Sequence, residues 1–183
     1  MHGGFYFRVL FVKPPNHNNK MKNITYLLTL IISALLLNAC SDEVEIDVEK
    51  PTIDLSIEGA FPTNCDTLYF DEPFTVKAML KDNMALGSYN IDIHNNFDQH
   101  NHSTEIETCN LDGKKTAVNP YVFIADYSIE DASEEHLVEL EMTIPSSDDG
   151  AMYDEGDYHF KINVVDREGW STLKGLNIKI LKR

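Results

Sequence analysis

Three observations predict an all-β fold, an immunoglobulin-like antiparallel β-sandwich, for residues 51–183. Apolar residues recur at every second position in one segment after another, the pattern of strands that are buried on one face and wet on the other. Helical periodicity is nearly absent. Residues 154–158 have the D-x-G-x-Y form of a tyrosine corner, in which the hydroxyl of Tyr158 returns to upstream backbone.

About seven short strands are expected, the number typical of an immunoglobulin-like sandwich. Each shows alternation or lies in a segment rich in β-branched and aromatic residues. They are predicted at 52–57, 74–81, 89–94, 121–127, 138–144, 158–164 and 176–180. Asp166-Arg167-Glu168-Gly169 is interpreted as the hairpin turn before the last strand. A jelly roll or another sandwich topology remains the alternative.

An apolar segment precedes the predicted sandwich. It runs from Ile24 to Leu37, follows the basic Lys22, and continues into Leu-Asn-Ala-Cys, which ends at Cys40 and resembles a bacterial lipobox. The segment is shorter than the ~20 apolar residues of a membrane-spanning helix. We therefore expect a lipoprotein signal peptide at 21–39, cleavage before Cys40, and a lipid on the Cys40 thiol.

The chain is expected to divide around this signal. Residues 1–20 are interpreted as an over-extended N-terminus, because Met21-Lys22 is a natural start. Residues 40–50 comprise the lipidated cysteine and an acidic segment without aromatic residues or glycine, which is typical of a flexible tether. Residues 51–183 have the length of one domain.

The predicted exported part is strongly acidic. The first 40 residues contain four of the 15 basic residues and none of the 30 acidic ones, which leaves a net charge of −19. Such a surface repels phosphate backbones and anionic lipid headgroups. We therefore expect no nucleic-acid partner, and membrane contact only through the lipid on Cys40. The same charge favours cations.

The cysteine count agrees with export. Three cysteines are present, and lipidation of Cys40 leaves Cys65 and Cys109 as a candidate disulfide pair. A disulfide here would close a long loop and stabilise the fold by ~4 kcal/mol. Two free thiols remain the alternative, because spacing alone does not determine connectivity.

The most unusual chemistry lies at the end of the third predicted strand, where three histidines and one aspartate fall within nine residues. Imidazole and carboxylate are ligands for zinc, copper and iron. Strands C and F of an immunoglobulin-like sandwich are neighbours, so an outward histidine on strand F is expected beside this segment. The candidate metal ligands are His94, Asp98, His100, His102 and His159. Solvated loop histidines are the alternative, since no complete zinc-motif spacing is present.

A second cation hypothesis concerns calcium. Asp82-Asn83, Asp166 and the acidic turn at 147–150 are oxygen-rich loop positions that calcium could use. None of them matches an EF-hand loop, and all are ordinary turn formers.

Enzyme motifs are absent. The sequence has no G-x-S-x-G elbow, HExxH motif, glycine-rich phosphate loop or dinucleotide fingerprint. We therefore expect no enzymatic activity and no catalytic residues, with a metal-dependent hydrolase as a minor hypothesis that would need an open coordination position on the histidines.

Several segments together resemble a known family. They are the lipobox, Lys50-Pro51-Thr52-Ile53, Lys81-Asp82-Asn83, the histidine segment at 91–103 and Tyr158-His159-Phe160. In combination they are similar to the Bacteroidetes-type lipoproteins catalogued as domain of unknown function 4625. The resemblance implies a periplasmic or surface sandwich with no established activity. Ser41-Asp42-Glu43 also loosely resembles a surface-export signal of such bacteria.

Two functions follow as hypotheses. The first is a lipoprotein anchored in the outer membrane, on its periplasmic face or at the cell surface, that acts as a non-enzymatic binding module for an unidentified ligand. The alternative is a metal-binding protein that captures or handles zinc, copper or iron through the histidine cluster.

Overall fold

A computed structural model of the chain describes residues 24, 26–28, 30 and 46–183. The chain separates into two compact units, residues 1–45 and 46–183, and the fold described below is that of the second unit. Cys40 and most of the predicted signal peptide lie outside the described residues. Within the described residues, no helix has the length and hydrophobicity needed to cross a membrane.

The second unit is a β-sandwich, as predicted. One sheet has three strands in the order β1-β3-β6, and the other has five in the order β2-β10-β9-β4-β5. A small hairpin, β7-β8, stands apart from both. The strands are β1 (Thr52–Asp54), β2 (Thr67–Tyr69), β3 (Pro73–Lys81), β4 (Leu86–Asn95), β5 (Phe123–Ser128), β6 (Glu135–Thr143), β7 (Ser147–Asp148), β8 (Ala151–Met152), β9 (Gly156–Asp166) and β10 (Ser171–Leu181).

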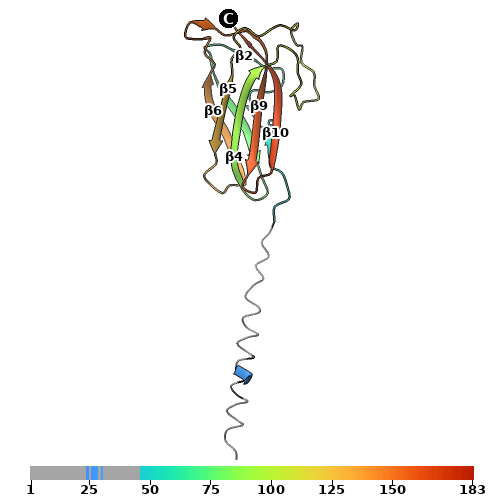
Figure 1. The fold of residues 1–183 in the computed structure, drawn as a ribbon, viewed down its shortest axis with the longest axis vertical. Helices are drawn as coiled ribbons and strands as arrows, with labels where there is room; N and C mark the ends of the chain where they lie inside the picture. Colours follow the sequence, from blue (N-terminus) through green and yellow to red (C-terminus); the bar gives the residue numbers. More distant parts are fainter. Residues whose placement is uncertain (1–23, 25, 29, 31–45) are drawn as a thin grey trace, which may run out of the picture. The chain divides into compact units, whose positions relative to one another are not determined.

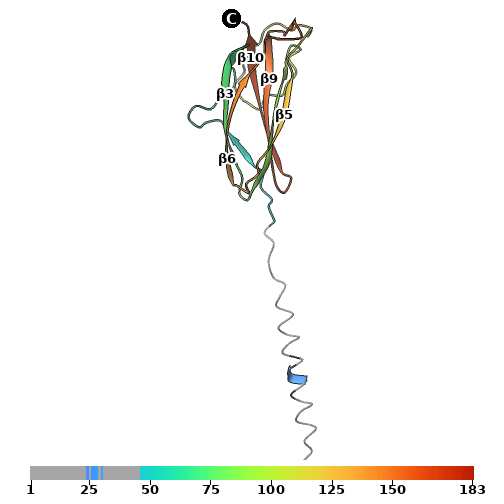
Figure 2. The same ribbon diagram turned by 90° about the vertical axis from the view of Figure 1, so that its left-hand side faces the viewer.

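The two sheets form the two layers of the sandwich. Figure 1 looks onto the five-stranded sheet, and Figure 2 shows β3 and β6 in one layer with β9, β10 and β5 in the other. All main pairings are antiparallel except that of β10 with β2, which is parallel. The β4-β9 pairing is the neighbourhood of strands C and F that the sequence predicted.

The core lies between the layers and consists of the alternating apolar residues. Val76 and Leu80 of β3 face Ile91 of β4 and Phe160 and Ile162 of β9, and all five are almost completely buried. Burial of such side chains contributes about 1.5–3 kcal/mol each, which explains why the two-residue period determines the strands.

The tyrosine corner forms as predicted. The Tyr158 hydroxyl donates a hydrogen bond to the carbonyl oxygen of Asp154 at 2.5 Å and accepts one from the backbone N–H of Tyr121 at 3.2 Å. Burial raises the pKa of Tyr158 to about 12. The corner joins the start of β9 to the segment that leads into β5.

The predicted hairpin turn after β9 also forms. Asp166 Oδ1 accepts hydrogen bonds from the backbone N–H groups of Gly169 and Trp170, at 2.6 and 2.8 Å. Gly169 has φ +96°, a conformation that residues with a side chain rarely adopt. The turn therefore depends on one carboxylate oxygen and one glycine.

The structure differs from the sequence prediction in several places. The last strand begins at Ser171 rather than at residue 176, and β5 begins at Phe123 rather than at residue 121. β2, β7 and β8 were not predicted, because strands of two or three residues are too short to show a period. The predicted strand at 52–57 ends at Asp54. The folded unit begins at Ile46 rather than at residue 51, and Asp47, assigned to the tether, is buried.

Candidate metal centre

The centre begins with a pair of histidines on neighbouring strands. His94 of β4 and His159 of β9 are direct partners in the antiparallel ladder. Tyr158 and Phe160, on either side of His159, point into the core. Because side chains alternate along a strand, His159 points to the outer face of the five-stranded sheet. It nevertheless has no exposed surface.

His159 is covered by the segment that connects β4 to β5. This connection, residues 96–122, has no regular secondary structure. Thr104 N–H donates to the carbonyl oxygen of Gly175 on β10 at 2.9 Å, and Gly175 N–H donates to Thr104 Oγ1 at 3.2 Å. These contacts bring the connection across the outer face of the sheet, so that His100 and His102 reach His159.

Gly175 is required for this crossing. A Cβ atom at residue 175 would lie 1.9 Å from the carbonyl oxygen of His102, far inside any van der Waals contact. The backbone approach is therefore possible only with glycine at this position on β10.

Four imidazole rings gather at the crossing. The ring centroids of His94 and His159 are 5.4 Å apart, and those of His100 and His102 are 4.9 Å apart. The other four pairs are separated by 5.6, 5.4, 4.9 and 5.2 Å. Each ring is thus in contact with the other three. One ring nitrogen from each of His94, His100 and His102 lies within 4.8 Å of the others.

Two of the histidines are oriented by carboxylates. Nδ1 of His94 is 2.7 Å from Asp92 Oδ1, and Nδ1 of His100 is 2.5 Å from Asp98 Oδ1. A carboxylate on Nδ1 leaves Nε2 with a free lone pair, which is the arrangement found behind many zinc-ligating histidines. Asp98 thus serves as the orienting partner of His100, and Asp92 has the same role for His94.

Asp92 is itself fixed by a cation. Lys161 Nζ lies 2.9 Å from Asp92 Oδ2. Burial raises the pKa of Asp92, but the hydrogen bonds from Lys161 and His94 outweigh it and hold the pKa below its ordinary value. Asp92 therefore remains an ionised carboxylate that accepts a hydrogen bond from His94 Nδ1–H.

His159 occupies the buried side of the cluster. Its Nε2 donates a hydrogen bond to the carbonyl oxygen of His100 at 3.0 Å, and its Nδ1 is buried without a hydrogen-bond partner. Burial lowers the pKa of His159 to about 4. The ring is therefore neutral at physiological pH and has one unused lone pair, on Nδ1.

The outer side of the cluster is open. His102 is exposed, and a surface pocket lined by His94, Phe97, His100 and Lys115 reaches two of the other rings. Burial and then the charge of Lys161 lower the pKa of His102, so the free base is favoured. An ion can reach these nitrogens from solvent, whereas His159 approaches from the sheet.

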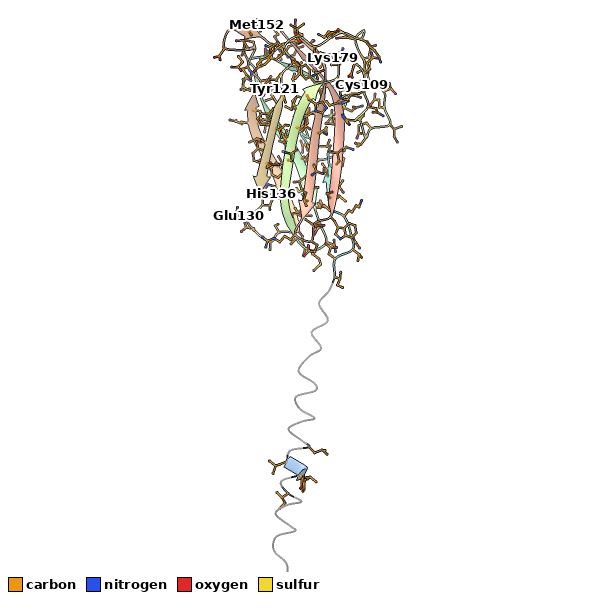
Figure 3. The ribbon with its side chains drawn as sticks, viewed as in Figure 1. Cys109, Tyr121, Glu130, His136, Met152 and Lys179 are labelled. Atoms are coloured by element: carbon orange, nitrogen blue, oxygen red, sulfur yellow. A yellow bond between two sulfur atoms is a disulfide. The ribbon has the colours of Figure 1, made fainter. Side chains whose placement is uncertain are left out.

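The connection is anchored to the end of the sandwich. A disulfide joins Cys109 of the connection to Cys65, with a Cα–Cα distance of 5.3 Å. Lys179 of β10 lies 2.6 Å from Asp112 Oδ1 and 2.9 Å from Asp157 Oδ1. Figure 3 shows Cys109 and Lys179 at the same end of the sandwich.

The structure thus brings together four of the five residues singled out from sequence and places the fifth, Asp98, behind His100. Sequence reasoning missed Asp92 and Gly175. Asp92 lies two residues before His94 and so on the same face of β4, a signal that was available. Gly175 is 71 residues from Thr104, its hydrogen-bond partner, and no local pattern marks it.

Comparisons with known proteins give one family and no function. The sequence matches the family described as Domain of unknown function (DUF4625) over residues 38–181. No curated protein is detectably similar to the chain. Among solved structures, the sporulation control protein Spo0M from Bacillus subtilis is similar with a TM-score of 0.35 and 9% identity. That similarity covers 75% of this chain and about half of Spo0M, 51%.

Proposed function

We propose a metal-binding function for this chain, which belongs to the family described as Domain of unknown function (DUF4625). In this proposal the protein is a non-enzymatic binding module, attached to the outer membrane by a lipid on Cys40. Its ligand is a transition metal ion, zinc or copper, held by His94, His100, His102 and His159.

The carrying observation is the arrangement of the four rings. Around a tetrahedral zinc ion with Zn–N bonds of about 2.0–2.1 Å, the centroids of four imidazoles lie about 5.2 Å from one another. The six centroid distances in this cluster range from 4.9 to 5.6 Å. The centroid spacing is therefore close to that of a tetrahedral four-histidine site. The ring nitrogens of His94, His100 and His102 lie within 4.8 Å of one another, and His159 has to move closer to them to become the fourth ligand.

The protonation states support the same function. Metal ions bind the neutral imidazole, so a proton competes with the metal for each ring. The pKa values of His102 and His159 are both lowered. Asp92 and Asp98 accept hydrogen bonds from Nδ1–H of the other two rings. The nitrogen left to coordinate a metal is Nδ1 in His159, which has no hydrogen-bond partner, and Nε2 in His94 and His100, whose Nδ1 atoms face carboxylates.

Four protein nitrogens favour binding over catalysis. Catalytic zinc sites keep one coordination position for water or substrate, whereas closed four-ligand sites are structural or serve in metal storage and transfer. A hydrolase would require His159 to stay outside the coordination shell and a general base to stand beside a bound water. The unpartnered Nδ1 of His159 instead supports a closed shell.

The test is elemental analysis of the untagged full-length chain beside a His100→Ala/His102→Ala variant. We expect about one equivalent of zinc or copper in the wild-type chain and none in the variant. His136→Gln is the matched control, since His136 contacts Tyr89 and lies outside the cluster. Zinc affinity measured in the wild type should fall below about pH 6.

A wild-type chain that contains no metal and refuses added zinc and copper would contradict the proposal. Equal metal content in the wild type and the double variant would move the site away from these histidines. A zinc affinity that does not change with pH would show that the imidazoles are not the ligands.

A further inference from the structure

We propose that Asp47, Asp82 and Asp166 form a second cation site, of the calcium class, where the chain enters the sandwich. One carboxylate oxygen from each of these residues lies within 4.8 Å of the others. The residues come from three separate segments: the entry segment before β1, the β3-β4 turn and the end of β9. This site is independent of the histidine cluster.

Each carboxylate uses one oxygen to accept hydrogen bonds. Asp82 Oδ2 accepts from the N–H groups of Met84 and Ala85, at 3.0 and 2.8 Å. Asp47 Oδ1 accepts from Glu49 N–H at 2.9 Å and from the Asn83 amide at 3.1 Å. Asp166 Oδ1 accepts from the turn after β9. Backbone and amide donors thus fix the direction of all three carboxylates.

The other oxygen of each carboxylate has no partner. Asp47 Oδ2, Asp82 Oδ1 and Asp166 Oδ2 are buried and receive no hydrogen bond. Asp47 and Asp166 are each only 4% exposed, so bulk solvent has little access to their carboxylates. Buried polar atoms are nearly always satisfied, and three unsatisfied oxygens in one cluster indicate a missing partner.

The missing partner is a cation. Among the described residues, no lysine, arginine or histidine forms an ion pair with any of the three aspartates. Three like charges at this separation repel one another strongly where water is excluded. A divalent ion removes the repulsion and satisfies all three oxygens together.

The donor set selects calcium rather than zinc or copper. All three protein ligands are oxygens, which hard cations prefer. Calcium accepts six to eight oxygen ligands in flexible geometry and completes its shell with backbone carbonyls and water. Magnesium requires a near-ideal octahedron, which carboxylates from three independent segments satisfy less readily.

The site would fasten the entry segment to the sandwich. Trp170 Nε1 donates to the carbonyl oxygen of Asp47 at 3.1 Å, and Asn83 donates to its side chain. A calcium ion coordinated by all three carboxylates would link Asp47 to Asp82 and Asp166 as well. In this proposal the ion helps to hold residues 46–50, the last part of the predicted tether, against the sandwich.

This assignment changes the calcium hypothesis drawn from sequence. Asp82 and Asp166 come together as expected, but the turn at 147–150 belongs to the β7-β8 hairpin at the other end of the sandwich. Figure 3 shows Met152 at that end and Glu130 at the opposite end. Arg167, beside Asp166, donates to the carbonyl oxygen of Glu130. Asp47, from the predicted tether, takes the place of the turn.

The experiment follows the thermal unfolding of the full-length chain in EGTA and with excess calcium, together with calcium titration calorimetry. At a hundredfold excess over Kd we expect the wild-type midpoint to rise by about 5–10 °C. Asp47→Asn and Asp47→Asn/Asp166→Asn should lose this rise. In EGTA their midpoints should equal or exceed that of the wild type, because asparagine keeps the hydrogen bonds and removes charge.

Asp66→Asn is the matched control. Asp66 also accepts a backbone hydrogen bond, from Thr63 N–H at 2.6 Å, but lies outside the cluster, so this variant should keep the full calcium response. Trp170, the only tryptophan of the chain, gives a second readout. Its emission should change on calcium addition in the wild type and the control, and not in the variants at Asp47.

Two results would overturn the proposal. The first is a wild-type chain without calcium binding or a midpoint shift at 10 mM calcium. The second is an equal shift in the wild type and Asp47→Asn/Asp166→Asn, which would indicate diffuse binding to the acidic surface. The single variant at Asp47 lies outside every strand, so its loss of response cannot be attributed to a disrupted sheet.

Discussion

The histidine cluster and the aspartate cluster lie at opposite ends of one ladder. Where β4 pairs with β9, His94 faces His159 near one end and Leu86 faces Asp166 at the other. Asp166 follows His159 by seven positions along extended β9, a distance of roughly 23 Å. The β4-β9 pair thus contributes His94 and His159 to the histidine cluster but only Asp166 to the aspartate cluster, and segments outside the pair contribute the other members of both.

The two clusters respond to burial in different ways. Burial lowers the pKa of His159 and leaves that ring neutral, so it adds no charge to the buried side of the histidine cluster. The three aspartates have no such arrangement, since their unpartnered oxygens face one another. If both proposals hold, the histidine cluster binds its metal with little rearrangement, whereas the aspartate cluster gains more stability from its cation.

The largest expected effect comes from removing the disulfide, which acts on the histidine end only. The bond between Cys65 and Cys109 spans 44 residues. On the chain-entropy estimate, its loss in Cys65→Ser/Cys109→Ser lowers the free energy of unfolding by about 4 kcal/mol. Urea denaturation measures this change. Zinc affinity should fall with it, whereas an equal fall in calcium affinity would mean that the two ends are not independent.

Acidification should lower the stability of the chain through His159, a member of the histidine cluster. The pKa of His159 is about 4 in the folded chain and near 6.5 in the unfolded chain. Between these values the unfolded chain binds a proton that the folded chain does not, so stability falls as the pH falls through this window. The expected loss is up to about 3 kcal/mol. It is measured by urea denaturation from pH 7.5 to 4.5 with chelator present.

His159→Gln is the comparison variant for the pH series. Glutamine can still donate to the carbonyl oxygen of His100 but does not titrate. Its stability should therefore decline less steeply than that of the wild type. Parallel curves for the two proteins would show that His159 does not have the lowered pKa.

A smaller effect is expected from Gly175→Ala, which changes no ligand. The added methyl group would meet the carbonyl oxygen of His102, so the connection must lift from β10. We expect a loss of about 2 kcal/mol in stability and weaker zinc binding, with calcium binding unchanged. Thermal unfolding and zinc titration measure both. Gly113→Ala is the control, because a Cβ atom there meets nothing within 4 Å; a similar loss in both variants would refute the crossing argument.

The smallest effect is expected from Asp92→Asn. Asparagine keeps an acceptor for His94 Nδ1 but loses the charge that strengthens this bond. Zinc affinity should fall by about tenfold, the lower end for a residue that orients a ligand. Competition with a zinc chelator measures it. Asp126→Asn on β5, whose carboxylate accepts from Asn90 and contacts no histidine, should leave zinc affinity unchanged.

Patterns within one segment, and rules for neighbouring strands, were sufficient for much of the fold and part of the histidine site. The alternation in β3, β4 and β9 predicted strands that the structure contains, and Asp154 and Tyr158 make the predicted corner. The expected neighbourhood of strands C and F paired His94 with His159. These inferences succeed because side-chain direction in a strand has a strict period of two, so one position determines the face of the next.

Long-range contacts were decided by tertiary structure alone. Asp47 lies in a segment whose composition is typical of a tether, yet it contacts Asn83 and Trp170, which are 36 and 123 residues away. The need for glycine at residue 175 arises only because the connection between β4 and β5 crosses β10 there. The sequence determined the longer strands, the family and three of the four histidines as one segment. Packing of the sheets and closure of the connection decided which side chains meet, because proximity across a fold depends on the path of the whole chain and leaves no local period.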